Sequence, residues 1–87
     1  MTMQHIEYIF SLQARDVPGM LVRITQVFAR RGCNIASLNV QHHHNGDTWR
    51  TIDIAAYDVE RPEQIEKQLQ KLIDVHSVTT RRLVDVG

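Results

Sequence analysis

Apolar and polar side chains alternate with period two along several segments of the chain. From Ile6 to Ala14 the even positions are apolar and most odd positions are polar. Segments 34–42 and 49–57 show the same alternation. Because successive side chains of a strand point to opposite faces of a sheet, each segment is predicted to be a strand with one buried face. A fourth strand is predicted over residues 75–84.

Apolar residues recur at helical spacing in two other segments, which are predicted to be amphipathic helices. Gly32 is expected to end the first helix, because glycine supplies the positive φ that a C-terminal turn usually needs. Pro62 suits the first turn of the second helix, where the missing N–H of proline is no loss. The expected apolar stripes are Leu21, Ile24, Val27 and Phe28 in the first helix, and Ile65, Leu69, Leu72 and Ile73 in the second.

The predicted order is strand, helix, strand, strand, helix, strand. Short connections and right-handed crossovers favour an α+β fold of the ferredoxin-like βαββαβ type, with one four-stranded antiparallel sheet and both helices on one face. The second strand then lies at an edge, and its expected inward side chains are Ala36, Leu38 and Val40. Residues 34–41 contain neither lysine nor proline to discourage pairing. This edge is therefore expected to pair with its own copy in a twofold homodimer.

The composition is that of one small globular domain, expected to span residues 1–87. Ten basic and ten acidic side chains cancel, which leaves no electrostatic footprint for nucleic acid or an anionic membrane. Cys33 is the only cysteine, which excludes an internal disulfide. Neither a signal peptide nor an apolar run of membrane-spanning length is recognisable, so a cytoplasmic location is expected.

The candidate binding chemistry lies where the first strand turns into the first helix. Pro18 and Gly19 occupy this turn, and a helix start leaves backbone N–H groups that can hold a carboxylate. Asp16 precedes them and can accept from a ligand ammonium, while Asn34, at the next strand, offers both a donor and an acceptor. These groups predict an amino-acid sensor. Two simpler roles stay open: Asp16 as a helix cap and Asn34 as a turn residue.

Two sequence stretches resemble a known family. Asp16 followed by the run 18–21, and then the run 27–38, are similar to the ACT domain. Residues 31–38 together with 71–75 more narrowly resemble the regulatory small subunit of acetohydroxyacid synthase, also called acetolactate synthase. The resemblance covers nearly the whole chain. Since many members of that family carry a second domain and this sequence stops at Gly87, a short form is expected.

The resemblance implies a regulatory function rather than catalysis, so no catalytic residue is expected. Family members bind a branched-chain amino acid, typically valine, between two ACT domains that pair edge to edge. They attach to a large catalytic subunit that uses thiamine diphosphate, a divalent metal and a flavin, modulate its activity and confer end-product inhibition. The implied ligand residues in this sequence are Asp16, Gly19 and Asn34, with neighbouring backbone at Met20 and Ile35.

The histidine run 42–44 is not a feature of that family. Adjacent residues of a strand point to opposite faces, so only His42 and His44 could share a metal ion. No third donor is fixed by spacing, and a solvated turn is predicted rather than a metal site.

Three other functions are compared with this hypothesis. A generic ACT sensor for another metabolic enzyme or a transcription regulator is the nearest alternative. An RNA-binding module of the same strand-helix order needs aromatic residues on the open face, whereas Tyr8 and Phe10 are expected on the buried face. An acyl-phosphate hydrolase needs an arginine in the first loop, where this sequence has Asp16, whose charge would repel phosphate.

Overall fold

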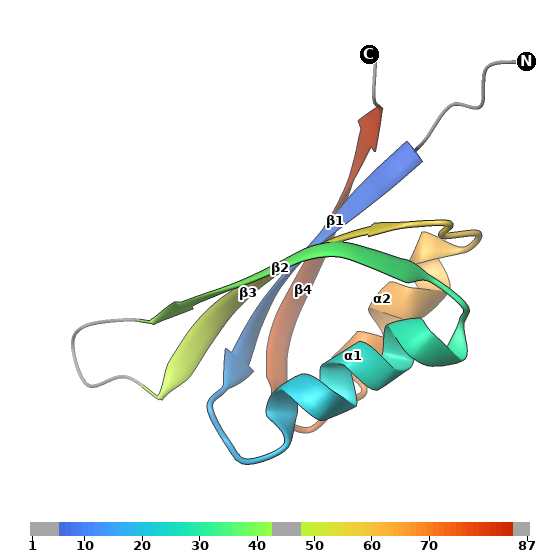
Figure 1. Ribbon diagram of the computed structural model, residues 1–87. Coiled ribbons are helices and arrows are strands. Elements are labelled where there is room, and N and C mark those ends of the chain that lie inside the picture. Colours follow the sequence, from blue (N-terminus) through green and yellow to red (C-terminus); the bar gives the residue numbers. More distant parts are fainter. Residues whose placement is uncertain (1–5, 43–47, 85–87) are drawn as a thin grey trace, which may run out of the picture.

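The computed structural model describes residues 6–42 and 48–84, and these form one sheet with two helices packed on it (Figure 1). The elements are β1 (Ile6–Arg15), α1 (Met20–Arg30), β2 (Asn34–His42), β3 (Trp49–Tyr57), α2 (Pro62–Gln70) and β4 (Val75–Val84). All six elements predicted from the periodicity are confirmed. Gly32 also ends the first helix as predicted, with a φ of +69° just after the last turn of α1.

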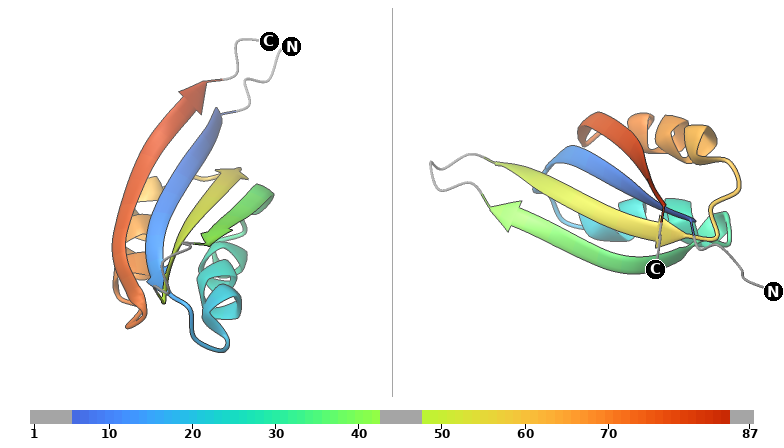
Figure 2. Two further views of the ribbon diagram at one scale, coloured as in Figure 1. Left: turned by 90° about the vertical axis from the view of Figure 1, so that its left-hand side faces the viewer. Right: turned by 90° about the horizontal axis from the view of Figure 1, so that it is seen from above.

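The sheet is antiparallel throughout, with strand order β2-β3-β1-β4. Both helices lie on one face and the other face is open (Figure 2). This is the ferredoxin-like βαββαβ arrangement predicted above, and β2 is an edge strand as expected. Towards the end of β4, strands β1 and β4 extend beyond the helices (Figure 1).

The core lies between the sheet and the two helices. The even positions of β1 and β3 supply its floor, because their side chains point to the helix face. Phe28 of α1 packs edge to face on Phe10, with ring centroids 5.1 Å apart. The fully or nearly fully buried residues are Phe10, Leu12, Ala14, Met20, Ile24, Phe28, Ile52, Ile54, Ala56, Ile65, Leu69 and Val78.

The alternation in β2 is interrupted. The register against β3 shifts between Ile35 and Ser37, which marks a β-bulge at Ala36. Ile35, Leu38 and Val40 pack against the core, whereas Ala36 is exposed. The prediction that Ala36 points inward is therefore wrong, since the extra residue of a bulge resets which positions face the core.

Helix α2 is shorter than its apolar stripe suggests. It ends at Gln70, and the N–H groups of Lys71 and Leu72 close the last turn on the carbonyls of Lys67 and Leu69. Leu72 still packs against the core, but Ile73 is 97% exposed in the following turn. The prediction for Ile73 is wrong because the chain has left the helical path before it. Within residues 6–42 and 48–84, no helix is long and apolar enough to cross a membrane.

Candidate functional site

The turn between β1 and α1 is a tight turn built on proline and glycine. The N–H of Met20 donates to the carbonyl of Val17 across the turn, at 3.1 Å. Pro18 occupies the second position, and Gly19 the third with φ +80° and ψ 2°. These angles are those of a type II turn, whose third position favours glycine because a Cβ would be strained there.

Several backbone amides at this turn remain open to a ligand. Among the described residues, the N–H groups of Gly19, Leu21 and Val22 have no acceptor, as expected for the start of a helix. They border a cleft of about 180 Å³. The Met20 N–H is already engaged by Val17, so the predicted contact through the Met20 amide does not fit this geometry. The cleft is lined by Asp16, Val17, Gly19, Met20, Leu21 and Val22.

Asp16 is held by an arginine that the sequence reasoning missed. Nη2 of Arg50 lies 2.9 Å from Oδ2 of Asp16, and its Nη1 donates to the carbonyl of Trp49 at 3.0 Å. The Asp16 side chain is still 50% exposed, so its carboxylate can meet a ligand. The N-cap of α1 is Gly19, and the alternative role of Asp16 as a cap is not observed. Arg50 pairs with Ala14 across the sheet, and that register is the signal that places it near Asp16.

Arg23 fixes the same turn from its other side. Its Nη1 donates to the carbonyl of Pro18 at 3.3 Å, and its Nη2 lies 2.7 Å from Oδ2 of Asp74. The backbone adds a further link, since the N–H of Arg15 donates to the Asp74 carbonyl at 2.7 Å. The turn that carries the candidate amides is thus braced against the α2–β4 connection.

Asn34 and Ile35 lie at the other end of α1 from this turn (Figure 1). Helix α1 has 11 residues, which at 1.5 Å per residue separates its two ends by about 16 Å. The Asn34 side chain donates from Nδ2 to Oδ2 of Asp58 at 2.7 Å. One chain therefore does not bring the predicted residues of both segments into a single site. Only a second copy could place Asn34 beside Gly19.

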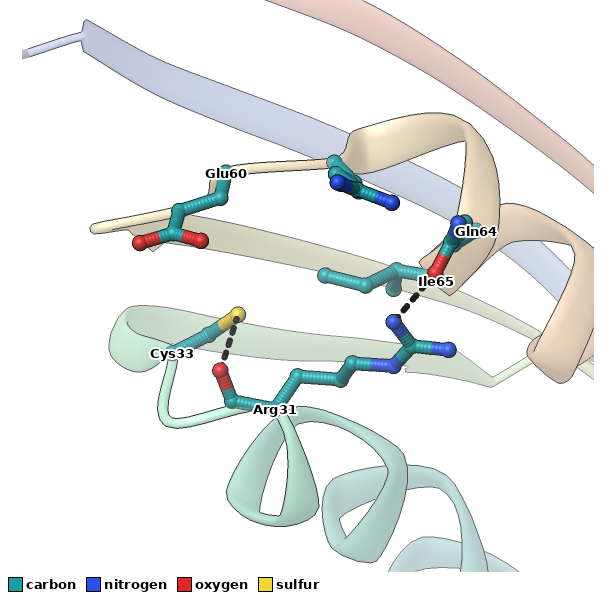
Figure 3. Close-up of a pocket in the computed structure, with 6 residues that line it drawn as sticks. Arg31, Cys33, Glu60, Gln64 and Ile65 are labelled. Carbon is teal, nitrogen blue, oxygen red and sulfur yellow. Dashed lines mark hydrogen bonds between the residues drawn. The ribbon is translucent and has the colours of Figure 1, made fainter.

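A second cleft, of about 200 Å³, lies at this other end of α1 (Figure 3). Nη1 of Arg31 donates to Oε1 of Gln64 across the cleft, and the Cys33 thiol donates to the Arg31 carbonyl at 3.9 Å. Burial is the main cause that raises the pKa of the Cys33 thiol above its usual value; nearby carboxylates add to it, and Arg31 opposes it. The sequence reasoning did not anticipate this cleft. Its lining residues are Arg31, Cys33, Glu60, Arg61, Gln64 and Ile65.

The histidine run lies largely outside the described residues. His42 ends β2 and is exposed, while His43 and His44 are not among the residues that the structure describes. In the described ranges, no three histidine, cysteine or acidic side chains gather closely enough to hold a metal ion. The metal hypothesis therefore gains no support from the described part of the chain.

Comparison with known proteins identifies the family. Residues 3–77 match the family model described as AHAS small subunit-like ACT domain. The acetolactate synthase small subunit of Mycolicibacterium smegmatis is 42% identical over 65 residues, covering 75% of this chain and 38% of that protein. The probable acetolactate synthase small subunit of Methanothermobacter thermautotrophicus is 41% identical over 71 residues, covering 82% of this chain and 42% of the relative.

Solved structures agree with this assignment. The acetolactate synthase small subunit from Thermotoga maritima superposes with a TM-score of 0.72 at 33% identity, covering 85% of this chain and 46% of that one. The ACT domain from GTP pyrophosphokinase of Chlorobium tepidum shares the fold, with a TM-score of 0.68 at 19% identity over 93% of this chain and all of that one. The chain spans well under half the length of the two sequence relatives. It belongs to the family of AHAS small subunit-like ACT domains.

Proposed function

We propose that this chain is a non-catalytic regulatory small subunit of acetolactate (acetohydroxyacid) synthase that binds a branched-chain amino acid, valine or a close analogue, between two copies of its ACT domain. The observation that carries the proposal is the cleft at the β1–α1 turn, with its open N–H groups beside the Asp16 carboxylate. The family match over residues 3–77 supports the regulatory role.

The cleft supplies a partner for each part of an amino acid. The N–H groups of Gly19 and Leu21 would hold the carboxylate, and the positive end of the α1 dipole adds to this attraction. Asp16, positioned by Arg50, would accept hydrogen bonds from the ammonium group. The apolar side chains of Leu21 and Val22 would receive the branched aliphatic group. Glycine at position 19 leaves room for the ligand to approach the backbone closely.

A second copy of the chain would complete this cleft. The outer edge of β2 has no neighbouring strand in the sheet order, so it can pair with the same edge of another copy. Such a twofold dimer would bring Asn34 and Ile35 of one copy towards the Gly19 turn of the other. A ligand that contacts both copies favours the arrangement it binds better, which is how binding at this site would modulate a partner.

The catalytic chemistry belongs to the large subunit in this proposal. Thiamine diphosphate, a divalent metal and a flavin would reside on that partner, and we assign no residue of this chain to them. The names of the relatives describe small subunits, which supports assembly with a larger chain. An ACT sensor that serves a different enzyme or a transcription regulator would bind an amino acid without associating with this synthase.

Calorimetric titration and co-purification together test the proposal. The isolated protein is expected to bind valine, leucine or isoleucine, whereas lysine and aspartate are expected to give no saturable heat because a charged side chain would be placed against Leu21 and Val22. The protein is also expected to co-purify with the synthase's catalytic subunit when the two are expressed together. Binding of no branched-chain amino acid would contradict the ligand assignment. Amino-acid binding without co-purification would contradict the assignment to this synthase.

A further inference from the structure

The second cleft combines charges of both signs around an apolar floor. Arg31 enters it from the end of α1, while Glu60 and Arg61 come from the β3–α2 connection. Figure 3 shows Glu60 and the Arg31 guanidinium on different sides of the cleft, with Ile65 between them. Ile65 closes the bottom of the cleft but is only 1% exposed, so the accessible lining is mainly polar. Two guanidinium groups therefore lie near one carboxylate around the mouth of the cleft.

These charges are not neutralised inside the described part of the chain. In residues 6–42 and 48–84 the ion pairs are Arg23 with Asp74 and Arg50 with Asp16, so neither Glu60 nor Arg61 is engaged in one. Arg61 is the N-cap residue of α2, and its side chain makes no capping hydrogen bond.

The remaining polar groups of the cleft fix its shape without changing its charge. The hydrogen bond from Arg31 to Gln64 holds one guanidinium against the first turn of α2. The Cys33 thiol stays protonated near neutral pH because burial raises its pKa. The lining therefore keeps two cationic groups and one anionic group.

We propose that this second cleft binds a free amino acid with a small uncharged side chain, such as valine, as a zwitterion. The ligand carboxylate would lie with Arg31 and Arg61 and its ammonium with Glu60. A lone anion would meet the unfavourable charge of Glu60, and a lone cation would meet the two guanidinium groups. A molecule with both charges satisfies all three, and about 200 Å³ suits a small metabolite rather than a nucleotide.

This site is separate from the one in the proposed function. It shares no lining residue with the β1–α1 cleft, and within one chain the length of α1, about 16 Å, lies between the two clefts. It also draws all its charged groups from one chain. The inference therefore adds a second amino-acid site to each chain, and either site can exist without the other.

Calorimetry on paired variants tests the inference. Gly19→Ala is expected to lose the valine site at the β1–α1 turn but to retain about one valine per chain in the second cleft. Adding Glu60→Gln or Arg61→Gln to Gly19→Ala is expected to weaken that remaining binding by about tenfold or more, since each removes a charge-assisted contact. Glu63→Gln and Arg30→Gln are matched controls, because both residues are exposed and neither lines the cleft. These controls are expected to leave the affinity unchanged.

Two ligand analogues distinguish a zwitterion site from a simple charge site. 3-Methylbutanoate keeps the carboxylate and lacks the ammonium, and 2-methylpropylamine lacks the carboxylate. Both are expected to bind the Gly19→Ala protein at least about tenfold more weakly than valine. Equal binding of valine and 3-methylbutanoate would overturn the inference, as would Gly19→Ala protein that binds no valine. Binding that depends on Glu60 and Arg61 but not on Gly19 would support this site and contradict the proposed function instead.

Discussion

Alanine at position 19 is expected to abolish measurable valine binding at the β1–α1 cleft and to lower the free energy of unfolding by about 1–2 kcal/mol. Gly19 has φ +80°, a left-handed conformation that costs an L-residue about 1–2 kcal/mol. A Cβ there would lie 3.0 Å from Nη1 of Arg23. That guanidinium would have to shift slightly, which would weaken its 3.3 Å hydrogen bond to the Pro18 carbonyl. The added methyl group would also obstruct the ligand's approach to the amides.

Gly32→Ala is the matched control for this prediction. Gly32 also has a positive φ, of +69°, but no atom lies within 4 Å of the position its Cβ would take. Gly32 follows the other end of α1, and it supplies neither an amide of the β1–α1 turn nor a residue assigned to the shared site. The Gly32→Ala protein is therefore expected to lose a similar amount of unfolding free energy, measured in urea. Its calorimetric affinity for valine at the β1–α1 turn is expected to stay unchanged. Gly19→Ala protein with unchanged total stoichiometry and affinity would place the site elsewhere.

Phe28→Ala is expected to produce the largest loss of stability, about 3–5 kcal/mol in the free energy of unfolding. Phe28 is completely buried, and its ring packs edge to face on Phe10 at the centre of the core. Removing it leaves a cavity that the sheet and α1 can close only in part. Since domains of this size are stable by about 5–15 kcal/mol, the loss is a large share of the total.

Urea unfolding followed by circular dichroism measures this loss. Leu83→Ala serves as the control, because Leu83 is 40% exposed and its truncation opens no enclosed cavity. It is expected to cost about 1 kcal/mol or less. A Phe28→Ala protein as stable as the Leu83→Ala protein would show that the core is not organised around the two phenylalanines.

The fold could be predicted from the sequence because local periodicity carries it. The bounds of β2 and β3 agree with the predicted segments, and α1 begins directly after the Pro18–Gly19 turn. The errors arose where pairing with a distant segment decides the outcome. Nothing local to Ala36 encodes its bulge, which depends on the register of β2 against β3. The exposure of Ile73 depends on the end of α2 at Gln70 and on the turn before β4. Asp74 of that turn is bound by Arg15 and Arg23, which are distant in the sequence.

The candidate site was predictable only in its local part. Proline and glycine at a strand-to-helix junction indicate the turn and its open amides from sequence alone. Arg50 joins Asp16 through the register of β3 against β1, which no local pattern specifies. The charged cleft around Glu60 and Arg31 joins segments about thirty residues apart, and contacts of such separation are set by the topology rather than by the residues' neighbours.

Mixing two defective chains tests the central claim, that each site at the turn combines Gly19 of one copy with Asn34 of the other. Glu60→Gln is included in every chain, so that only the turn site is measured. Gly19→Ala and Asn34→Ala proteins would be unfolded, mixed in equal amounts, refolded together and titrated with valine. In a twofold dimer with shared sites, half of the dimers are mixed and each regains one intact site, so about a quarter of the turn-site stoichiometry is expected to return. A mixture that binds no more valine than its two separate components would contradict the shared site.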